Sequence, residues 1–568
     1  MPPRTLVIGT RGSALALAQA NLVLAQLRAR GTVARLQVIA TEGDRRAPDT
    51  AWGEGAFVGA IEAALLGGDI DVAVHSAKDV PTDEDPRLAI AAFPPRAAPF
   101  DTIVAPAGRM VRSLADLPEG ARVGTDSPRR TAFLRAVRPD LRLHPLHGNV
   151  DTRLRRLDSG DTDTLVLAEA GLTRLGRADR ISFRLEPEIV PPAPGQGAIA
   201  VQVRADDEQA TQAVAQLDDA PTRVAVEAER AILAASGGGC RAPLGALGTV
   251  IDGRLELLAG FARPDGSIAT TAARRGSPDD PDLVVGVLDD LASGVAVAAR
   301  ATGLPRILVT RAAAQSAALL LALADRGLAP LPVPAIEIAP AAEDLAPIVA
   351  RLDAYDWVVV TSPNAAEVLC RSAERSGRSL DRRPAAGLGG ATAGPGRPRW
   401  AAVGVATERT LRAAGVAVAL RPARASGEDL AAALPIEPGS RVLLPRSDLA
   451  DGRLVDRLRA RAVLVEEVVA YRTIEAPAAS IPLLAPALEE GPQAVIFTSG
   501  STVRGALALA DRLGLRDRVL ALPAICIGVP TATEAARHGF QVVAQVEGRG
   551  VAAIAEVAAQ YLTGQEEP

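Results

Sequence analysis

Through the first half of the chain, short apolar runs alternate with stretches of helical periodicity. The strand-like runs include TLVIGT, DIDVAVHS, ARVGTDS and TDTLVLAEA, and the helical stretches between them include SALALAQANLVLAQLRAR and PRRTAFLRAV. Strands that alternate with helices of this kind are typical of an α/β fold. The first half is therefore predicted to be α/β.

Two proline-rich breaks divide this half, at residues 93–99 and in the run VPPAPGQG at residues 190–197. We interpret both as crossovers between two lobes. A third segment starts near Pro221 with the helical pattern VAVEAERAILAAS, then GGGC and the strand-like RLELLAGFA. The predicted parts are lobe 1 at about 1–96 and 195–216, lobe 2 at about 97–194, and a small α+β domain at about 217–302.

A second α/β module is predicted after a join near residues 301–305, where a helical stretch ends and the strand-like RILVTR begins. This module has an internal repeat: WVVVTSPNAAEVL parallels AVIFTSGSTVRGAL, and AVGVATERTLRAAGVAV parallels ICIGVPTATEAARHGFQV. Extra residues in the first repeat fit a Gly/Pro-rich loop at residues 381–399. Within 303–568 we therefore expect two similar lobes, lobe A at about 305–334 and 473–562 and lobe B at about 338–470.

Composition limits the possible functions. The 568 residues exceed what a single core supports, and no apolar run approaches the roughly 18 residues of a membrane span. No signal peptide is evident, so we expect a cytoplasmic protein, and a monomer. The net charge of −5 argues against broad nucleic-acid binding, and the three cysteines form neither a disulfide framework nor a metal-binding pair. We expect small-molecule partners and no metal.

The segment DVAVHSAKDVP contains Lys78, which is the one lysine among the 62 Lys and Arg residues. Lys78 and Asp79 follow a predicted buried strand, so they should project from the carboxyl end of a sheet. Asp79 could stabilise a cationic intermediate there. The alternative for such a pair is a surface ion pair.

Three places in the first half share one arrangement: a strand ends, a small or polar residue caps a helix, and arginine lies in or next to the first turn. They are Arg11 with Ser13, residues 127–130, and residues 149–153. Helix N-termini and guanidinium groups both favour carboxylates. A ligand with several carboxylates is therefore expected, although any one of these arginines could be a solvated surface charge.

Cys240 follows three glycines in a predicted loop. Most free cysteines are small core residues. The glycine-rich setting instead favours an accessible thiol and a covalent tether.

The first half resembles the porphobilinogen deaminase family. The matching runs are GTRGSALALAQ, DVAVHSAKDVP, VGTDSPRR, GNVDTRLRRLDSG, LAEAGLTRLG, PAPGQGAIAV and EAERAILAASGGGC. The resemblance implies two periplasmic-binding-protein-like lobes plus the α+β domain, and release of ammonia as four porphobilinogen units become hydroxymethylbilane. It also implies a dipyrromethane cofactor attached through Cys240, and a catalytic role for Asp79. The implied cofactor contacts are Lys78, Ser76, Thr125, Ser127, Arg129 and Arg130, and the implied substrate contacts are Arg11, Ser13, Arg153 and Arg174.

This sequence departs from the family pattern in three places. His147 stands where the family has arginine before GN, and the GEGAF run carries Glu54 where the family has lysine. Gly59 replaces a further lysine. A deaminase half of weakened activity is therefore an alternative.

The second half is similar to the uroporphyrinogen-III synthase family, through TSPNAA, LLPRS, VVAYRT, FTSGSTV and IGVPTA. This implies two α/β lobes joined by a two-stranded connector (VPAIEIAP with EEVVAYRTIEA), no cofactor, and cyclisation of the bilane with inversion of ring D. Tyr471 is expected at a strand end and matches a tyrosine proposed to assist departure of the hydroxyl, although a tyrosine at a strand end is more often packing. The implied cleft residues are Thr361, Ser362, Thr407, Thr498, Ser499 and Thr531.

A different class of function fits the same pattern, because paired α/β lobes with anion-binding residues also build non-catalytic binding modules. Such a module needs neither a loop thiol nor a strand-end acid, so Cys240 and Asp79 favour an enzyme.

Overall fold

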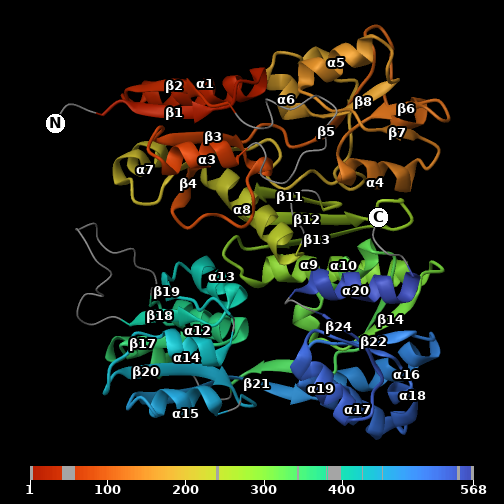
Figure 1. Cartoon of the computed structure of the whole chain (residues 1–568). Helices are drawn as coiled ribbons and strands as arrows, with labels where there is room; N and C mark the ends of the chain where they lie inside the picture. The colour runs from red at the N-terminus through yellow and green to blue at the C-terminus, as the bar shows by residue number, and fades with distance from the viewer. Residues whose placement is uncertain are drawn as a thin grey trace. The chain divides into compact units, whose positions relative to one another are not determined.

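The computed structural model describes residues 4–40, 58–237, 242–341, 345–378, 380, 398–424, 426–450, 452–546 and 550–564 (Figure 1). Glu54, Cys240 and residues 381–397 of the Gly/Pro-rich run lie outside these ranges. Two compact units are present: Met1–Val333 with Pro486–Thr498 and Leu520–Pro568, and Pro334–Ala485 with Ser499–Val519.

The first sheet has five strands in the order β2-β1-β3-β10-β4. β1 pairs in parallel with β2 and β3, whereas β10 is antiparallel to β3 and β4. Its core packs α1 and α7 against apolar residues of β1, β3 and β10. The bounds are β1 Leu6–Thr10, α1 Ala14–Ala29, β2 Ala34–Val38, α3 Gly59–Leu66, β3 Val72–Ser76, β4 Leu88–Ala92, β10 Ile199–Arg204 and α7 Glu208–Ala215.

Between β4 and β10 the chain builds a second five-stranded sheet, in the order β7-β6-β8-β5-β9. β6 is parallel to β7 and β8, and β5 is antiparallel to β8 and β9. The chain thus leaves the first sheet and returns to it, as the two proline-rich breaks suggested. The bounds are β5 Asp101–Val104, β6 Arg122–Gly124, α4 Pro128–Val137, β7 Arg142–His144, α5 Val150–Asp158, β8 Thr164–Ala168, α6 Glu169–Arg174 and β9 Phe183–Arg184.

The third part is a three-stranded antiparallel sheet, β11-β12-β13, covered by α8 and α9. The predicted helix near Pro221 and the predicted strand RLELLAGFA are both confirmed. The bounds are α8 Ala220–Ala235, β11 Leu244–Ile251, β12 Arg254–Ala262, β13 Ala269–Gly276 and α9 Asp282–Arg300.

The second half of the chain forms two further sheets, in the orders β15-β14-β22-β23-β24 and β16-β21-β20-β17-β18-β19. The bounds in the first are β14 Arg306–Val309, α10 Ala317–Asp325, β15 Ala329–Pro332, α16 Ile481–Glu489, β22 Ala494–Phe497, α17 Gly500–Leu513, α18 Arg516–Leu520, β23 Ala524–Cys526, α19 Val529–Arg537, β24 Val542–Gln545 and α20 Val551–Thr563. Those in the second are β16 Ile336–Pro340, α11 Ala346–Ala350, β17 Trp357–Val360, α12 Pro363–Arg375, β18 Arg399–Ala402, α13 Val405–Ala413, β19 Val418–Leu420, α14 Gly427–Ala433, β20 Arg441–Ser447, α15 Arg453–Arg459 and β21 Leu464–Glu475.

The internal repeat has a structural counterpart. β17-α12 and β18-α13 form adjacent parallel units in one sheet, and β22-α17 and β23-α19 do so in the other. Gly415 and Gly539 follow α13 and α19 with φ of 79° and 95°, a backbone region that favours glycine. The predicted connector strands also pair, because β16 is antiparallel to β21.

The join expected at residues 301–305 lies between a helix and a strand. α9 ends at Arg300 and β14 begins at Arg306. One hydrophobic core contains residues of α8, α9, β11 and β12 together with residues of α10, β14, β15, β22, β23 and α20. Apolar residues that sequence periodicity assigned to separate domains are thus buried against each other.

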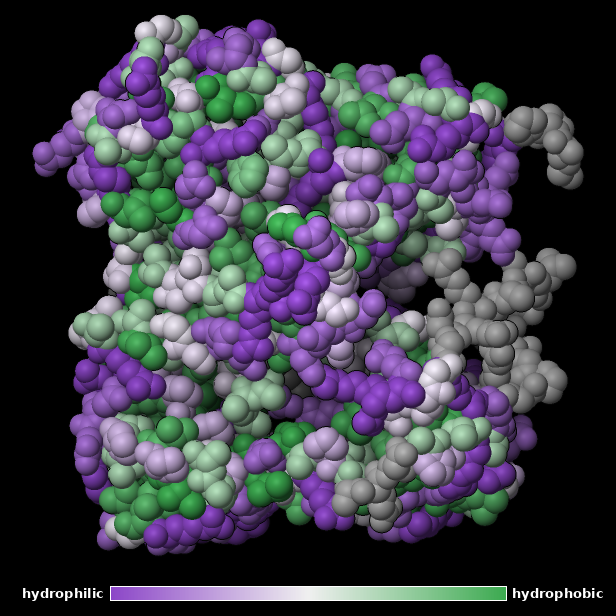
Figure 2. Space-filling view, turned by 180° about the vertical axis from the view of Figure 1, so that it is seen from behind, coloured by the Kyte–Doolittle hydropathy of each residue, from purple (hydrophilic) through white to green (hydrophobic). Residues whose placement is uncertain are grey.

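No helix in the described part of the chain is long and apolar enough to cross a membrane. On the face seen in Figure 2, hydrophilic and hydrophobic residues are mixed in small patches. Many of the charged groups form ion pairs, such as Arg274 with Asp290 at 2.6 Å.

Candidate functional site

Lys78 and Asp79 lie where the sequence predicted, in a single 3-10 turn (Ala77–Asp79) directly after β3. Burial lowers the pKa of Lys78 to about 8, and its Nζ donates a hydrogen bond of 3.2 Å to Gln196 Oε1. Burial raises the pKa of Asp79, against the opposing effect of Lys78 and Arg11. A half-buried carboxyl group beside two cations is suited to stabilising positive charge in a ligand.

Asp101, a fully buried residue that sequence reasoning missed, organises the opposite side of the site. It pairs with Arg129 Nη2 at 2.8 Å and with Arg130 Nη2 at 2.6 Å. Burial alone would raise the pKa of Asp101, but the two guanidinium groups hold it well below its usual range. Part of the charge that the sequence assigned to ligand carboxylates is therefore neutralised within the protein.

Gln196 connects the two sides. Its Nε2 donates to Asp101 Oδ1 at 2.9 Å and to the carbonyl oxygen of Pro99 at 2.7 Å, while its Oε1 accepts from Lys78. Gln196 belongs to the VPPAPGQG run, which the sequence predicted only as a crossover between lobes. A continuous polar network thus joins the turn after β3 to the start of α4.

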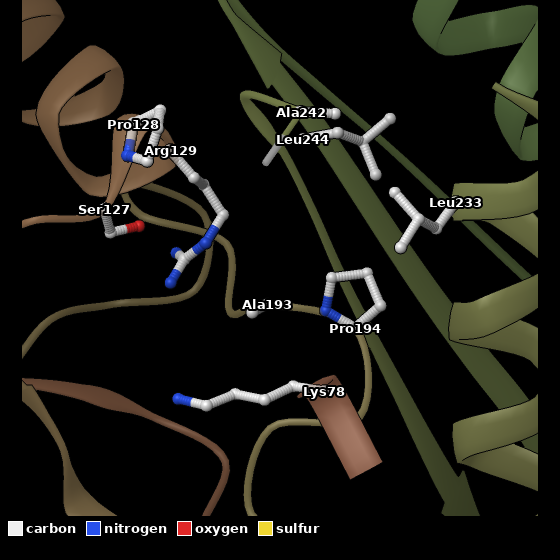
Figure 3. A pocket seen from close by; sticks show the side chains of 9 residues that line it. All are labelled: Lys78, Ser127, Pro128, Arg129, Ala193, Pro194, Leu233, Ala242 and Leu244. Carbon is white, nitrogen blue, oxygen red and sulfur yellow. The ribbon is translucent and has the colours of Figure 1, made fainter. Parts of the chain in front are cut away.

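A pocket opens beside this network (Figure 3). Lys78, Ser127 and Arg129 supply its polar side, and Leu233, Ala242, Leu244 and Pro194 supply an apolar side. Such a lining suits a ligand with flat apolar rings and carboxylate side chains. A dipyrromethane fits that description.

Two further predicted arginines are desolvated. Burial lowers the pKa of Arg153 to about 10, with an additional effect of Arg130 in the same direction, and the buried Nε of Arg153 makes no hydrogen bond to the described residues. Burial also lowers the pKa of Arg174 to about 10, and its Nη2 donates to the carbonyl of Gly197 at 2.7 Å. An anionic ligand would restore favourable surroundings to these cations.

The predicted caps are confirmed. The side chains of Ser13, Ser127 and Asn149 accept hydrogen bonds from the backbone N–H groups of Ala16, Arg130 and Thr152 at the starts of α1, α4 and α5. The hydroxyl groups of Ser76 and Thr125 form hydrogen bonds with neighbouring residues of the protein. Ser76 Oγ exchanges hydrogen bonds with Gln19, and Thr125 Oγ1 accepts from Ser127 N.

His147 lies beside a carboxylate of the protein, although its Nδ1 makes no hydrogen bond to the described residues. Its Nδ1 lies 2.7 Å from Asp126 Oδ2. Gly59 begins α3, while Glu54 lies outside the described residues.

In the second half, the predicted hydroxyl residues gather at helix starts. Ser362 caps α12 and Ser499 caps α17, each by accepting from a backbone N–H. Thr361 and Thr498 precede these caps, and Thr407 and Thr531 are buried in the first turns of α13 and α19. Because β17 neighbours β18 and β22 neighbours β23, each sheet presents two helix N-termini side by side.

Arg311 is a further residue that sequence reasoning missed. It follows β14, the strand beside β22, at the same carboxyl edge as Thr498. Burial lowers the pKa of Arg311, and its Nε makes no hydrogen bond to the described residues. The RILVTR run carried the same signal as Arg11, an arginine just past a strand end.

Tyr471 lies within β21, opposite Pro340, rather than at a strand end. It is 8% exposed and belongs to a core that includes Val358, Leu443 and Ala470. This position agrees with the packing role that was weighed against catalysis.

Three family models match the chain. Residues 6–212 match "Porphobilinogen deaminase, dipyromethane cofactor binding domain", residues 224–291 match "Porphobilinogen deaminase, C-terminal domain", and residues 317–556 match "Uroporphyrinogen-III synthase HemD".

Curated relatives match the first half. The porphobilinogen deaminase of Acidothermus cellulolyticus is 48% identical over 282 residues, covering 48% of this chain and 84% of its own length. That of Mycobacterium tuberculosis is 49% identical over 280 residues, covering 48% and 90%.

Solved structures resemble the chain more distantly. A mutant uroporphyrinogen III synthase from Thermus thermophilus is 18% identical, covering 46% of this chain and 100% of its own at a TM-score of 0.34. A periplasmic substrate-binding protein from Coxiella burnetii is 13% identical, covering 38% and 91% at a TM-score of 0.25.

The fold and the sites define a two-part α/β enzyme that acts on small polyanionic molecules. The chain belongs to the porphobilinogen deaminase family and carries a uroporphyrinogen-III synthase domain as its second half. It is therefore a bifunctional enzyme of tetrapyrrole biosynthesis, with a hydroxymethylbilane synthase and a uroporphyrinogen-III synthase in one polypeptide, and a dipyrromethane cofactor in the first.

Proposed function

We propose that Asp79 is the catalytic group of the deaminase half and that the cofactor is attached through Cys240. The pocket of Lys78, Ser127 and Arg129 facing Leu233 and Ala242 carries this proposal. Ala242 follows Cys240 by only two positions, so a thiol tethered there is within chain reach of the polar side.

The residues around the pocket have different roles in this proposal. Lys78, Arg129 and Arg153 bind carboxylates, with Arg11 and Arg174 taking further acidic groups. Each elongation step breaks the C–N bond of an aminomethyl group, releases ammonia, forms one C–C bond and returns the displaced pyrrole proton to solvent. Asp79 stabilises the positive charge that develops as ammonia leaves, because its carboxylate is desolvated while the charges of Lys78 and Arg11 favour its ionised form.

Mass spectrometry of the intact chain tests the attachment. The parent protein should carry the mass of a dipyrromethane, and the adduct should map to the tryptic peptide that contains residue 240. Cys240→Ser should remove it, whereas Cys526→Ser should keep it, because Cys526 is fully buried in β23. An adduct that maps to Cys370 or Cys526 would overturn the proposal.

For the synthase half we propose that the paired helix N-termini and the hydroxyl residues Thr361, Ser362, Thr407, Thr498, Ser499 and Thr531 bind the acidic side chains of the bilane. Arg311 adds one desolvated cation to this set. Any part that Tyr471 plays in departure of the hydroxyl requires its ring to expose the phenol to the bilane.

We propose that lobe boundaries follow the sheets: 1–96 with 195–216, 97–194 and 217–302 in the deaminase half, and 305–334 with 473–562 and 338–470 in the synthase half. We also propose that the protein works as a cytoplasmic monomer. Sedimentation of the purified full chain tests its oligomeric state, with a dimer as the contradicting result.

A further inference from the structure

Two helix N-termini of the second sheet lie side by side. β6 and β7 are parallel neighbours, α4 follows β6, and α5 follows β7. The ends of the two strands are joined, because the backbone N–H of Thr125 donates to the carbonyl oxygen of His144 at 3.0 Å. Ser127 caps α4 and Asn149 caps α5. Since helix N-termini favour negative charge, this edge of the sheet suits an anion.

Asp126 places a carboxylate of the protein at this edge. It immediately precedes Ser127 in the loop after β6, and its side chain is 27% exposed. Its Oδ2 lies 2.7 Å from Nδ1 of His147, in the loop after β7. Burial and the charge of Arg130 lower the pKa of Arg153, near the start of α5, whereas the charge of Asp126 raises it. Asp126 thus lies beside groups that would attract a ligand carboxylate.

These neighbouring groups still lack hydrogen bonds. Nδ1 of His147 and the buried Nε of Arg153 make no hydrogen bond to the described residues. The guanidinium group of Arg129 differs, because it pairs with the fully buried Asp101 at 2.8 Å. Asp126 therefore supplies negative charge here but leaves hydrogen bonds that an arriving carboxylate can supply.

We propose that Asp126 is an affinity-limiting residue of the deaminase: its carboxylate competes with the acidic side chains of the substrate for His147 and Arg153. This inference rests on the proposed binding of carboxylates by Arg153. Ser127 and Arg129, one and three positions after Asp126, line the pocket, so the competition takes place at its edge (Figure 3). Like charges repel more strongly in a partly desolvated site than in water. Because the growing chain gains carboxylates at every step, this repulsion limits how tightly the product is held.

Full-chain variants that change the charge with little change of shape test the proposal. Asp126→Asn removes the charge, Asp126→Ser is a second neutral variant, and Asp126→Glu keeps the charge. Asp158→Asn is the matched control, because it removes a carboxylate from the other end of α5, where Asp158 pairs with Arg180 at 2.6 Å. The readouts are the KM and kcat for porphobilinogen at low and at high ionic strength, the synthase activity on supplied hydroxymethylbilane, and the Tm.

We expect Asp126→Asn and Asp126→Ser to lower the KM for porphobilinogen by about threefold without raising kcat, the scale of one partly screened charge contact. The difference from the parent should shrink at high ionic strength, because salt screens the repulsion. Asp126→Glu and Asp158→Asn should match the parent, and synthase activity and Tm should not change. An unchanged or raised KM in the neutral variants would overturn the proposal, as would an equal fall of KM in Asp158→Asn.

Arg153→Gln in the same series separates this inference from the proposed function. An unchanged KM in Arg153→Gln would refute carboxylate binding by that arginine. A raised KM there, combined with an unchanged KM in Asp126→Asn, would refute only the role of Asp126.

Discussion

The two halves of this enzyme meet polyanionic ligands with different groups. The deaminase half offers its ligand desolvated cationic side chains, including Lys78, Arg129 and Arg153. Asp101 pairs with Arg129, and Gln196 accepts a hydrogen bond from Lys78. The synthase half offers helix N-termini and hydroxyl groups, with Arg311 as a desolvated cation.

The difference fits what each half does. A growing chain that stays attached through several steps gains carboxylates with each addition, and fixed cations in a dry site bind them strongly. A bilane that enters once and leaves as product is served by weaker amide and hydroxyl donors, which release it more easily. Variants in the two halves should therefore differ in the size and pH dependence of their effects.

The largest effect is expected at Asp79. Asp79→Ala should lower the rate of bilane formation by about 10²- to 10³-fold or more, because stabilisation of a developing charge is lost in a desolvated site. Synthase activity on supplied bilane should be unchanged. Asp83→Ala is the control, since Asp83 is exposed four positions further on. Near-normal turnover in Asp79→Ala would remove this residue from catalysis.

Lys78 should give the deaminase half a pH dependence that the synthase half lacks. Burial lowers the pKa of Lys78 to about 8, so the free enzyme loses this cation as the pH rises through about 8. The deaminase kcat/KM should fall over that range because carboxylate binding weakens. Lys78→Met should lower kcat/KM by about tenfold at neutral pH, as expected for a lost charge-assisted hydrogen bond. The same alkaline fall in Lys78→Met would assign it to another group.

A variant of Arg311 should affect the synthase half and leave the deaminase half unchanged. Arg311→Gln should raise the synthase KM for hydroxymethylbilane by about fivefold, a moderate loss because amide and hydroxyl donors remain. Deaminase kinetics should not change. Arg537→Gln is the control, because the side chain of Arg537 is 70% exposed on α19. An unchanged synthase KM in Arg311→Gln would mean that this cation has a structural role.

The smallest effect is expected at His147. His147 lies 2.7 Å from Asp126, and an arginine there could keep that partner while adding donors toward the pocket. His147→Arg should lower the KM for porphobilinogen by about twofold, the scale of a partly screened charge contact. A rise in KM would show instead that the histidine is fitted to Asp126.

Local patterns were sufficient to predict much of this protein. The strand and turn that present Lys78 and Asp79 and the caps Ser13, Ser127 and Asn149 all depend on residues close together in the chain. Hydrophobic periodicity and capping act over a few residues, so the sequence displays them directly. The family motifs added the chemistry of both halves.

The tertiary structure alone decided which distant groups meet. Lys78 and Gln196 are 118 positions apart, and Gln196 lies 95 positions from Asp101, so no periodicity linked them. The same holds for the core that residues of the deaminase half and of the synthase half build together. The apolar face of a helix shows that the helix must be buried, but it does not identify the element that covers it, because the hydrophobic effect is non-directional. Only the tertiary packing shows that helices of the synthase half complete the core of the deaminase half.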